Sequence, residues 1–474
     1  MELDDLTLME SWAENEFAAA DLGDVRRTRR LIAFAERLGN RPTASLPDAT
    51  NDPAMLKAAY RFFDTDAIDP AAILASHVQA TYDRMASVPL VLAVQDTTSL
   101  DWTHHPATRD LGPLASTHQQ GLLAHTTLAL TPERVPLGLL AQQVWARDAA
   151  SFAQLPDHKT RPISEKESYK WLLGVEAASA ARRACPDTQI VVVCDAEADL
   201  FDLFVQPRAA GVDLLIRASQ NRRVEHPNRF LWEAMATGTL AGTRLLDIPK
   251  RDGQPARQAT VTVRFARLTL RAPKHRAKEG LAAVRVWAVW AVEEQPPAGL
   301  EPVEWLLLTT VAVETAAAAE ERLEWYACRW GIEVWHKVLK SGCRIEAVQL
   351  ECADRLKRCL AVYSVISWRI VWATMLARAL PDAPCTALLE EEEWQALYCT
   401  IHRTGLVPAQ APSLRQAVRW IAQLGGFQGR TGDGEPGVTV LWKGFQHLAD
   451  LTMMYHILRA DAPGKRAHPP SYRY

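Results

Sequence analysis

The stretch WYACRWGIEVWHKVLKSG, residues 325–342, predicts a helix with an unusual distribution of charge. With ~100° of rotation per residue, five polar side chains project within an arc of roughly 80°: Tyr326, Arg329, Glu333, Lys337 and Lys340. A surface helix normally has a broad polar face, whereas here the polar line is narrow. The pattern indicates that the polar line faces a groove. The rest of the helix is expected in a core, and it carries Trp325, Ile332, Val334, Trp335, Val338 and Leu339.

The composition describes a folded protein of several domains. A chain of 474 residues exceeds one compact core, so we expect two or three domains. Apolar residues make up 48% and charged residues 23%, which is typical of soluble proteins. The formal charge is −3, so any nucleic-acid surface must be local. The opening, MELDDLTLMESWAENEF, shows no signal peptide, and we expect a cytoplasmic (bacterial) location with association to the nucleoid when the protein is bound to DNA.

One apolar run, CLAVYSVISWRIVWATMLARAL (359–380), is long enough to cross a bilayer. Arg369 lies at its centre, with Ser364 and Ser367 nearby, and charged groups are costly inside a membrane. We therefore expect a buried or interface helix and no membrane partner.

A basic cluster lies near the start, in DVRRTRRLIAFAERLGNRP (24–42), within a segment that looks helical up to about residue 70. Between Val25 and Arg61 there are eight basic and three acidic residues. Taken alone, such a cluster is somewhat better explained as a solvated helix face than as a binding surface.

Two predicted strands end in carboxylates. VPLVLAVQDTTSLDW (88–102) reaches Asp96, and TQIVVVCDAEADLFDLF (188–204) reaches Asp195. Such strand ends are where α/β sheets present functional groups. Between them, SEKESYKWLLGVEAASAARRA (164–184) predicts a helix with Ser164 and Glu167 as a capping box. A block of short β runs follows, from about 205 to 313, and helices return after it.

Asp96, Asp195 and Glu333 together form a candidate metal site. Carboxylates without His or Cys suit Mg²⁺ or Mn²⁺ better than zinc. Two such ions can activate water or a 3′-hydroxyl and stabilise the leaving oxygen in a phosphoryl transfer. Arg329, with Lys337 and Lys340 on the same helix face, would then hold phosphates.

The residues alone leave a structural interpretation open. Acids at strand ends are common, and Glu333 with Lys337 forms an i,i+4 pair that simply stabilises a helix. Four neighbouring acids compete for the metal role: Asp101, Glu197, Asp199 and Asp202.

The polar line matches a known signature. Tyr326, Arg329, Glu333 and Lys340 fit the pattern Tyr-x2-Arg-x3-Glu-x6-Lys, and the chain resembles the insertion-sequence-four family of DDE transposases. Further motifs of the family occur in the same order: DLGDVRRTRRL (21–31), AYRF (59–62), DTTSL (96–100), EKESYKWL (165–172), VCDAEAD (193–199), WLLLT (305–309), LGGF (424–427) and LWKG (441–444).

The resemblance implies an α/β fold with an RNase H-like catalytic core over residues 71–372, interrupted by a β-rich insertion at about 205–313. A helical domain that binds DNA ends is implied over residues 1–70, and a helical dimerisation domain over 373–474. It also implies a metal-binding catalytic triad of Asp96, Asp195 and Glu333.

The family's DNA contacts map onto particular positions. The resemblance places phosphate contacts at Tyr326, Arg329 and Lys340, with Lys337 nearby. It implies that Trp305 holds a flipped base and that Arg217 contacts DNA from the insertion. Recognition of the end sequence is implied for the N-terminal arginines Arg26, Arg27, Arg30 and Arg61. The acidic LEEEEW (389–394) departs from the basic composition known for this region, so neither the recognised end sequence nor the DNA affinity carries over.

The implied function is cut-and-paste transposition of double-stranded DNA, from transposon ends into target DNA, with hairpin formation. The implied cofactor is two Mg²⁺ ions per site, for which Mn²⁺ substitutes. A homodimer on DNA and no small-molecule substrate are expected. Two alternatives remain: a catalytically silent DNA-binding regulator or inhibitor of transposition, and a structure-selective endonuclease on the same core.

Overall fold

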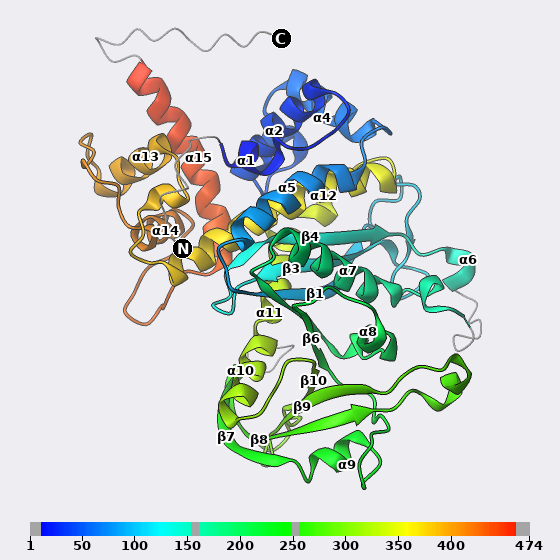
Figure 1. Ribbon diagram of the computed structural model, residues 1–474. Coiled ribbons are helices and arrows are strands. Elements are labelled where there is room, and N and C mark those ends of the chain that lie inside the picture. Colours follow the sequence, from blue (N-terminus) through cyan, green and yellow to red (C-terminus); the bar gives the residue numbers. More distant parts are fainter. Residues whose placement is uncertain (1–10, 153–160, 249–255, 461–474) are drawn as a thin grey trace.

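The computed structural model describes residues 11–152, 161–248 and 256–460. Figure 1 shows N-terminal helices at one end, a sheet at the centre, a β-rich lobe at the other end and C-terminal helices to one side. The basic tail GKRAHPPSYRY (464–474) lies outside the described residues.

The centre of the fold is a sheet in the order β4-β3-β1-β5-β6. β1 pairs in parallel with β5, and β5 with β6, while β3 is antiparallel to both β1 and β4. This is the strand arrangement of an RNase H-like core, and it confirms the predicted fold class. The strands are β1 (Leu90–Asp101), β2 (Gly112–Pro113), β3 (Gln120–Leu130), β4 (Pro136–Trp145), β5 (Gln189–Cys194) and β6 (Val212–Arg217).

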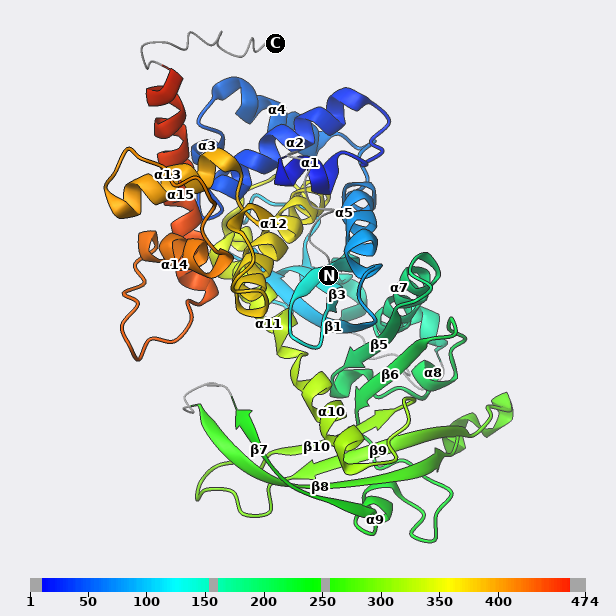
Figure 2. The ribbon, with the colours of Figure 1, turned by 60° about the vertical axis from the view of Figure 1, so that its left-hand side comes forward.

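The β-rich lobe continues the same sheet. Its strands are β7 (Thr239–Ile248), β8 (Arg257–Leu270), β9 (Val284–Val292) and β10 (Glu304–Thr309), with the short helix α9 (Leu231–Met235). β10 pairs antiparallel with β6, so the lobe is anchored on the last strand of the core (Figure 2). β6 lies inside the stretch predicted as insertion, yet it pairs with β5 as a core strand.

Helix α7 (Tyr169–Ala184) covers the core sheet, followed by α8 (Phe201–Val205) after β5. The predicted capping box of α7 is wrong, because the helix begins at Tyr169 and Ser164 lies in the preceding 3₁₀ turn. Glu167 instead accepts two hydrogen bonds from Arg147, at 2.5 and 2.8 Å, which ties the start of α7 to the end of β4.

The N-terminal helices pack around their own aromatic cluster. They are α1 (Trp12–Phe17), α2 (Val25–Asn40), α3 (Leu46–Thr50), α4 (Pro53–Asp64) and α5 (Pro70–Met85). Phe34 on α2 makes edge contacts with Phe62 and Phe63 on α4, with ring centroids 4.9 and 5.4 Å apart. Asp24, Ser45, Asp52 and Asp69 each cap a helix with a side-chain oxygen, as their residue types favour.

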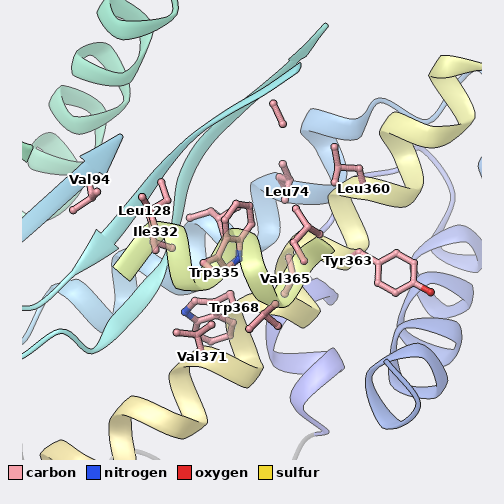
Figure 3. Close-up of a cluster of buried hydrophobic side chains, with 14 of the residues drawn as sticks. Leu74, Val94, Leu128, Ile332, Trp335, Leu360, Tyr363, Val365, Trp368 and Val371 are labelled. Carbon is pink, nitrogen blue, oxygen red and sulfur yellow. The ribbon is translucent and has the colours of Figure 1, made fainter. Parts of the chain in front are cut away.

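The stretch 325–342 is not one continuous helix. Helix α10 (Ala316–Ala327) ends before Cys328, α11 (Trp330–Lys337) starts after Arg329, and a π-helical turn follows at Val338–Gly342. Trp335 and Ile332 of α11 pack between the sheet and α12, as Figure 3 shows. Val334, predicted to be in the core, is 36% exposed, because it lies within about 60° of the exposed Lys337 around α11.

Helix α12 (Ala353–Ala379) contains the long apolar run and is a buried helix, as predicted. It is apolar and long enough to span a membrane, but 89% of its most apolar window lies inside the protein. Tyr363 and Trp368 on α12 lie in the same cluster as Trp335 (Figure 3). The remaining helices are α6 (Ala149–Phe152), α13 (Glu391–His402), α14 (Leu414–Leu424) and α15 (Val438–Ala460).

A buried polar triplet joins the N-terminal helices to the core. Glu16 on α1 accepts hydrogen bonds from His77, at 2.5 Å, and from Arg84, at 2.7 Å, both on α5. The Nε2 atom of His77 accepts from the backbone N–H of Leu139 on β4, so its proton lies on Nδ1 and is donated to Glu16. Burial raises the pKa of Glu16, but Arg84 and His77 outweigh it and lower that pKa to about 2.

We expect this triplet to make the protein acid-sensitive. The folded pKa of Glu16 is depressed from an ordinary 4.5, so its stabilisation is present above about pH 4.5 and is lost as pH falls toward 2. The shift corresponds to about 3 kcal/mol. The urea midpoint of the wild type should fall steeply over this range, while Glu16→Gln should start lower at pH 7 and change less. Parallel pH profiles of the two proteins would contradict this role of Glu16.

Candidate active site

Asp96 and Asp195 lie at neighbouring positions of adjacent parallel strands. The β1–β5 pairing ends with Val94 opposite Val193, and each aspartate follows two residues later in its own chain segment. The prediction that Asp96 ends its strand is wrong, because β1 continues to Asp101, where it pairs with β3 alone. The end of β5 at Cys194 therefore opens the edge of β1 where Asp96 lies.

Glu333, on α11, lies close to the two aspartates, and Arg329 connects it to Asp96. The Arg329 guanidinium lies 3.7 Å from the Asp96 carboxylate and forms a short ion pair with Glu333. Arg329 is mostly buried, while the Glu333 side chain is 46% exposed. The structure thus brings three predicted carboxylates, those of Asp96, Asp195 and Glu333, around the guanidinium of a fourth predicted residue, Arg329.

The carboxylates repel one another in this arrangement. The pKa of Asp96 is raised to about 6, chiefly by burial; Arg329 opposes this rise, and the charges of Asp195 and Glu333 contribute to it. The pKa of Asp195 is also raised, chiefly by burial. Clustered carboxylates that cannot all ionise easily are typical of a site that receives cations.

The donor atoms fit hard divalent ions. Three carboxylates from β1, the end of β5 and α11 supply oxygen ligands alone, the set that Mg²⁺ and Mn²⁺ prefer. Within the described residues no three acidic, His or Cys side chains are already close enough to hold an ion. The Arg329 guanidinium lies between Asp96 and Glu333 and supplies the positive charge there.

His336, which no sequence motif identified as a site residue, lies next to Asp96. Its Nδ1 atom is 3.8 Å from the Asp96 carboxylate, and burial lowers its pKa to about 3. A neutral imidazole at this distance forms no ion pair, so His336 packs below the site.

The four competing acids have other partners. Asp199 is buried against Arg222, with Nη2–Oδ1 2.7 Å, and Asp202 pairs with Arg276 at 2.7 Å. Asp101 accepts from the backbone and hydroxyl of Thr103 at 2.8 and 2.5 Å. Glu197 is an exposed side chain 3.6 Å from Lys170. Because these four acids are paired elsewhere, Asp96 and Asp195 are the better candidates for metal ligands.

Trp305 and Tyr326 lie at the joint between the core and the β-rich lobe. Their rings meet edge to face with centroids 5.1 Å apart, and both are nearly buried. Arg217, at the end of β6, donates to the backbone oxygen of Glu304 at 3.0 Å beside this pair. The three predicted DNA contacts therefore share one flank of the carboxylates, and a flipped base would have to displace a neighbour to reach the face of Trp305.

The lysines lie on the opposite flank. Lys340 donates to the backbone oxygen of Ser99 on β1 at 2.8 Å and pairs with Glu346 at 3.2 Å. It borders a hollow of about 550 Å³ that also contains Arg344. Lys337 is exposed one turn earlier.

The four N-terminal arginines are not part of this cluster. Arg26, Arg27 and Arg30 lie on α2, and Arg61 lies on α4, at the far side of α5 and α12 from the core sheet (Figure 1). Arg26 and Arg30 are exposed, while Arg27 donates to the Leu22 backbone oxygen at 2.8 Å. They form a separate basic surface.

Three protein-family models match successive parts of the chain. The chain matches a transposase DNA-binding model over residues 9–68 and a transposase DDE domain model over residues 175–364. It matches a transposase Tn5 dimerisation domain model over residues 365–460. The DDE match includes Asp195 and Glu333 and begins after Asp96.

An RNase H-like core with these matches defines a DDE transposase, a metal-dependent enzyme that cleaves DNA and transfers strands. The chain belongs to the insertion-sequence-four family of these enzymes and is of the Tn5-like kind, a DNA-binding protein that dimerises through its C-terminal region.

Proposed function

We propose that this DNA transposase moves its element by a cut-and-paste route through a DNA hairpin. This proposal rests on one observation: Asp96, Asp195 and Glu333 lie around Arg329 at the open edge of β1. Asp96, Asp195 and Glu333 are the catalytic triad in this proposal. They would hold two Mg²⁺ ions, for which Mn²⁺ would substitute. When bound, such ions activate a water or a 3′-hydroxyl and stabilise the leaving oxygen.

Four phosphoryl transfers follow at this site. Water attacks one strand at the transposon end, breaking one P–O bond and freeing a 3′-hydroxyl. That hydroxyl attacks the opposite strand, which forms a hairpin and releases the flanking DNA. Water reopens the hairpin, and the same 3′-hydroxyl then attacks target DNA. Each step exchanges one P–O bond for another, so one set of carboxylates serves all four.

The cationic and aromatic residues position the DNA. Arg329, released from Glu333, and Lys340 bind phosphates on the two sides of the carboxylates, with Lys337 beside them. Trp305 stacks against the extruded base. At the same joint, Tyr326 contacts a phosphate and Arg217 contacts the DNA from the insertion. Arg26, Arg27, Arg30 and Arg61 bind the end sequence.

We further propose that the dimer pairs two transposon ends, each subunit cutting the end bound mainly by its partner. Trp442 and most of α12 are buried within the chain, so neither offers an apolar surface to a second subunit. The end of α15 fits better, because it exposes four apolar side chains inside the matched dimerisation region: Met453, Met454, Ile457 and Leu458.

The proposal is tested with linear DNA that carries the inverted repeats flanking the gene. Wild-type protein and Asp195→Ala are incubated with Mg²⁺, and the products are separated on a denaturing gel. Nicked, hairpin and joined products are expected from the wild type alone. Binding without cleavage in Mg²⁺ or Mn²⁺ would indicate a regulator. Cutting of branched DNA regardless of end sequence, without joining, would indicate a structure-selective nuclease.

A further inference from the structure

Lys170 occupies a position that is costly for a lysine. It is the second residue of α7, where the positive end of the helix dipole disfavours a cation. Its side chain is only 12% exposed, and burial disfavours an ammonium group. Within the described residues its charged partner is Glu197, at 3.6 Å, which is beyond hydrogen-bond distance. A helix start would be more stable with almost any neutral residue at this position.

Two tryptophans hold the side chain in place. The ammonium nitrogen lies 5.8 Å from the ring centroid of Trp145, at the end of β4, and 5.5 Å from that of Trp171. Trp171 is almost fully buried, and the Arg147–Glu167 ion pair fixes the turn before α7. The two tryptophans and the fixed helix start therefore hold the Lys170 side chain in one orientation.

The direction is toward Asp195. Helix α7 ends at Ala184 and β5 begins at Gln189, and this short connection makes them antiparallel. The start of α7 therefore lies at the end of β5, beside Asp195. Glu197, the partner of Lys170, donates its backbone N–H to Asp195 at 3.0 Å, so Lys170 lies against the turn that carries Asp195 and Glu197. Lys170 and Arg329 both act electrostatically on the Asp195 carboxylate.

We propose that Lys170 is a catalytic residue that binds a phosphate oxygen of the DNA strand lying over Asp195. Its three N–H donors are not used by hydrogen bonds within the described residues, and a phosphodiester supplies acceptors of the opposite charge. An ammonium fixed beside the reacting phosphate stabilises the charge that develops in the transition state without reorganising. The inference rests on the proposed role of Asp195.

The alternative is that Lys170 only forms an ion pair with Glu197. That pair has one exposed partner, with Glu197 69% exposed, and exposed pairs contribute little stability. Such a contribution does not offset the burial of an ammonium at a helix start. Glu197→Ala is thus a matched control, because it removes the ion pair and keeps the backbone N–H that bonds Asp195.

The test measures single-turnover nicking in preassembled complexes with end DNA. Lys170→Met keeps the apolar stem against the tryptophans and removes the charge, and it should bind end DNA normally while nicking about 100-fold more slowly. Lys170→Arg should recover most of the loss, and Glu197→Ala should nick as the wild type does. Melting temperatures of all variants are measured beside the rates.

Three outcomes would overturn the inference. Equal defects in Glu197→Ala and Lys170→Met would reduce Lys170 to its ion pair. Recovery of Lys170→Met in Mn²⁺ or excess Mg²⁺ would show that it acts through ion binding. A rate equal to wild type would remove it from the site. If the wild type itself makes no nick, the proposed function fails instead, which separates the two claims.

Discussion

Asp96→Ala should bind transposon-end DNA as tightly as the wild type and cleave it at least about 1000-fold more slowly. End recognition is proposed for arginines on α2 and α4, far from β1, so binding should survive. Cleavage needs the carboxylate that faces Arg329 and Glu333 across the open edge of β1. Gel-shift assays measure the first quantity, and single-turnover nicking measures the second.

Asp101→Asn is the matched control for Asp96→Ala. Both residues lie on β1, but the Asp101 side chain accepts from Thr103, and an asparagine oxygen can keep these bonds. The control should therefore nick at a rate close to wild type. If Asp101→Asn lost activity and Asp96→Ala kept it, the metal ligand on β1 would be Asp101. The sequence alone does not exclude Asp101 from that role.

Much of the fold was predictable because its signals are local. The apolar runs that end at Asp96 and Asp195 became neighbouring parallel strands, and the arginine-rich start became capped helices. β6 was placed in the insertion although it is a core strand, because a short apolar run does not show which strand it pairs with. The capping box at Ser164 failed because Glu167 finds Arg147, a partner twenty residues earlier in the chain, instead of the helix start.

The candidate site was predictable in its members but not in its contacts. A helical projection placed Arg329 and Glu333 on one face, which is correct, but it could not show that the guanidinium reaches Asp96 on another element. Lys170 was visible only as part of the EKESYKWL motif, because its burial and its closeness to Asp195 depend on how α7 returns along β5. Tertiary contacts of this kind leave no periodic trace in the sequence.

Asp199 tests whether a residue of the VCDAEAD motif acts in catalysis or only stabilises the fold. It lies four residues after Asp195 in VCDAEAD, but its side chain is fully buried and bonds Arg222 and two backbone N–H groups, those of Ser219 and Gln220, both at 2.9 Å. These bonds fix the loop that follows Arg217 and leads into the β-rich lobe. Asp199→Ala leaves the buried Arg222 charge unpaired and should lower the unfolding free energy by about 3–5 kcal/mol.

The double variant Asp199→Ala/Arg222→Met should be more stable than Asp199→Ala, because it removes the unpaired buried charge and leaves only the backbone groups unsatisfied. Chemical denaturation measures both variants. Below its melting temperature, Asp199→Ala should still nick end DNA at a rate close to wild type, in contrast to Asp195→Ala. Loss of nicking in a folded, DNA-binding Asp199→Ala protein would contradict the supporting role. That result would place Asp199 among the groups that act on the reacting phosphate.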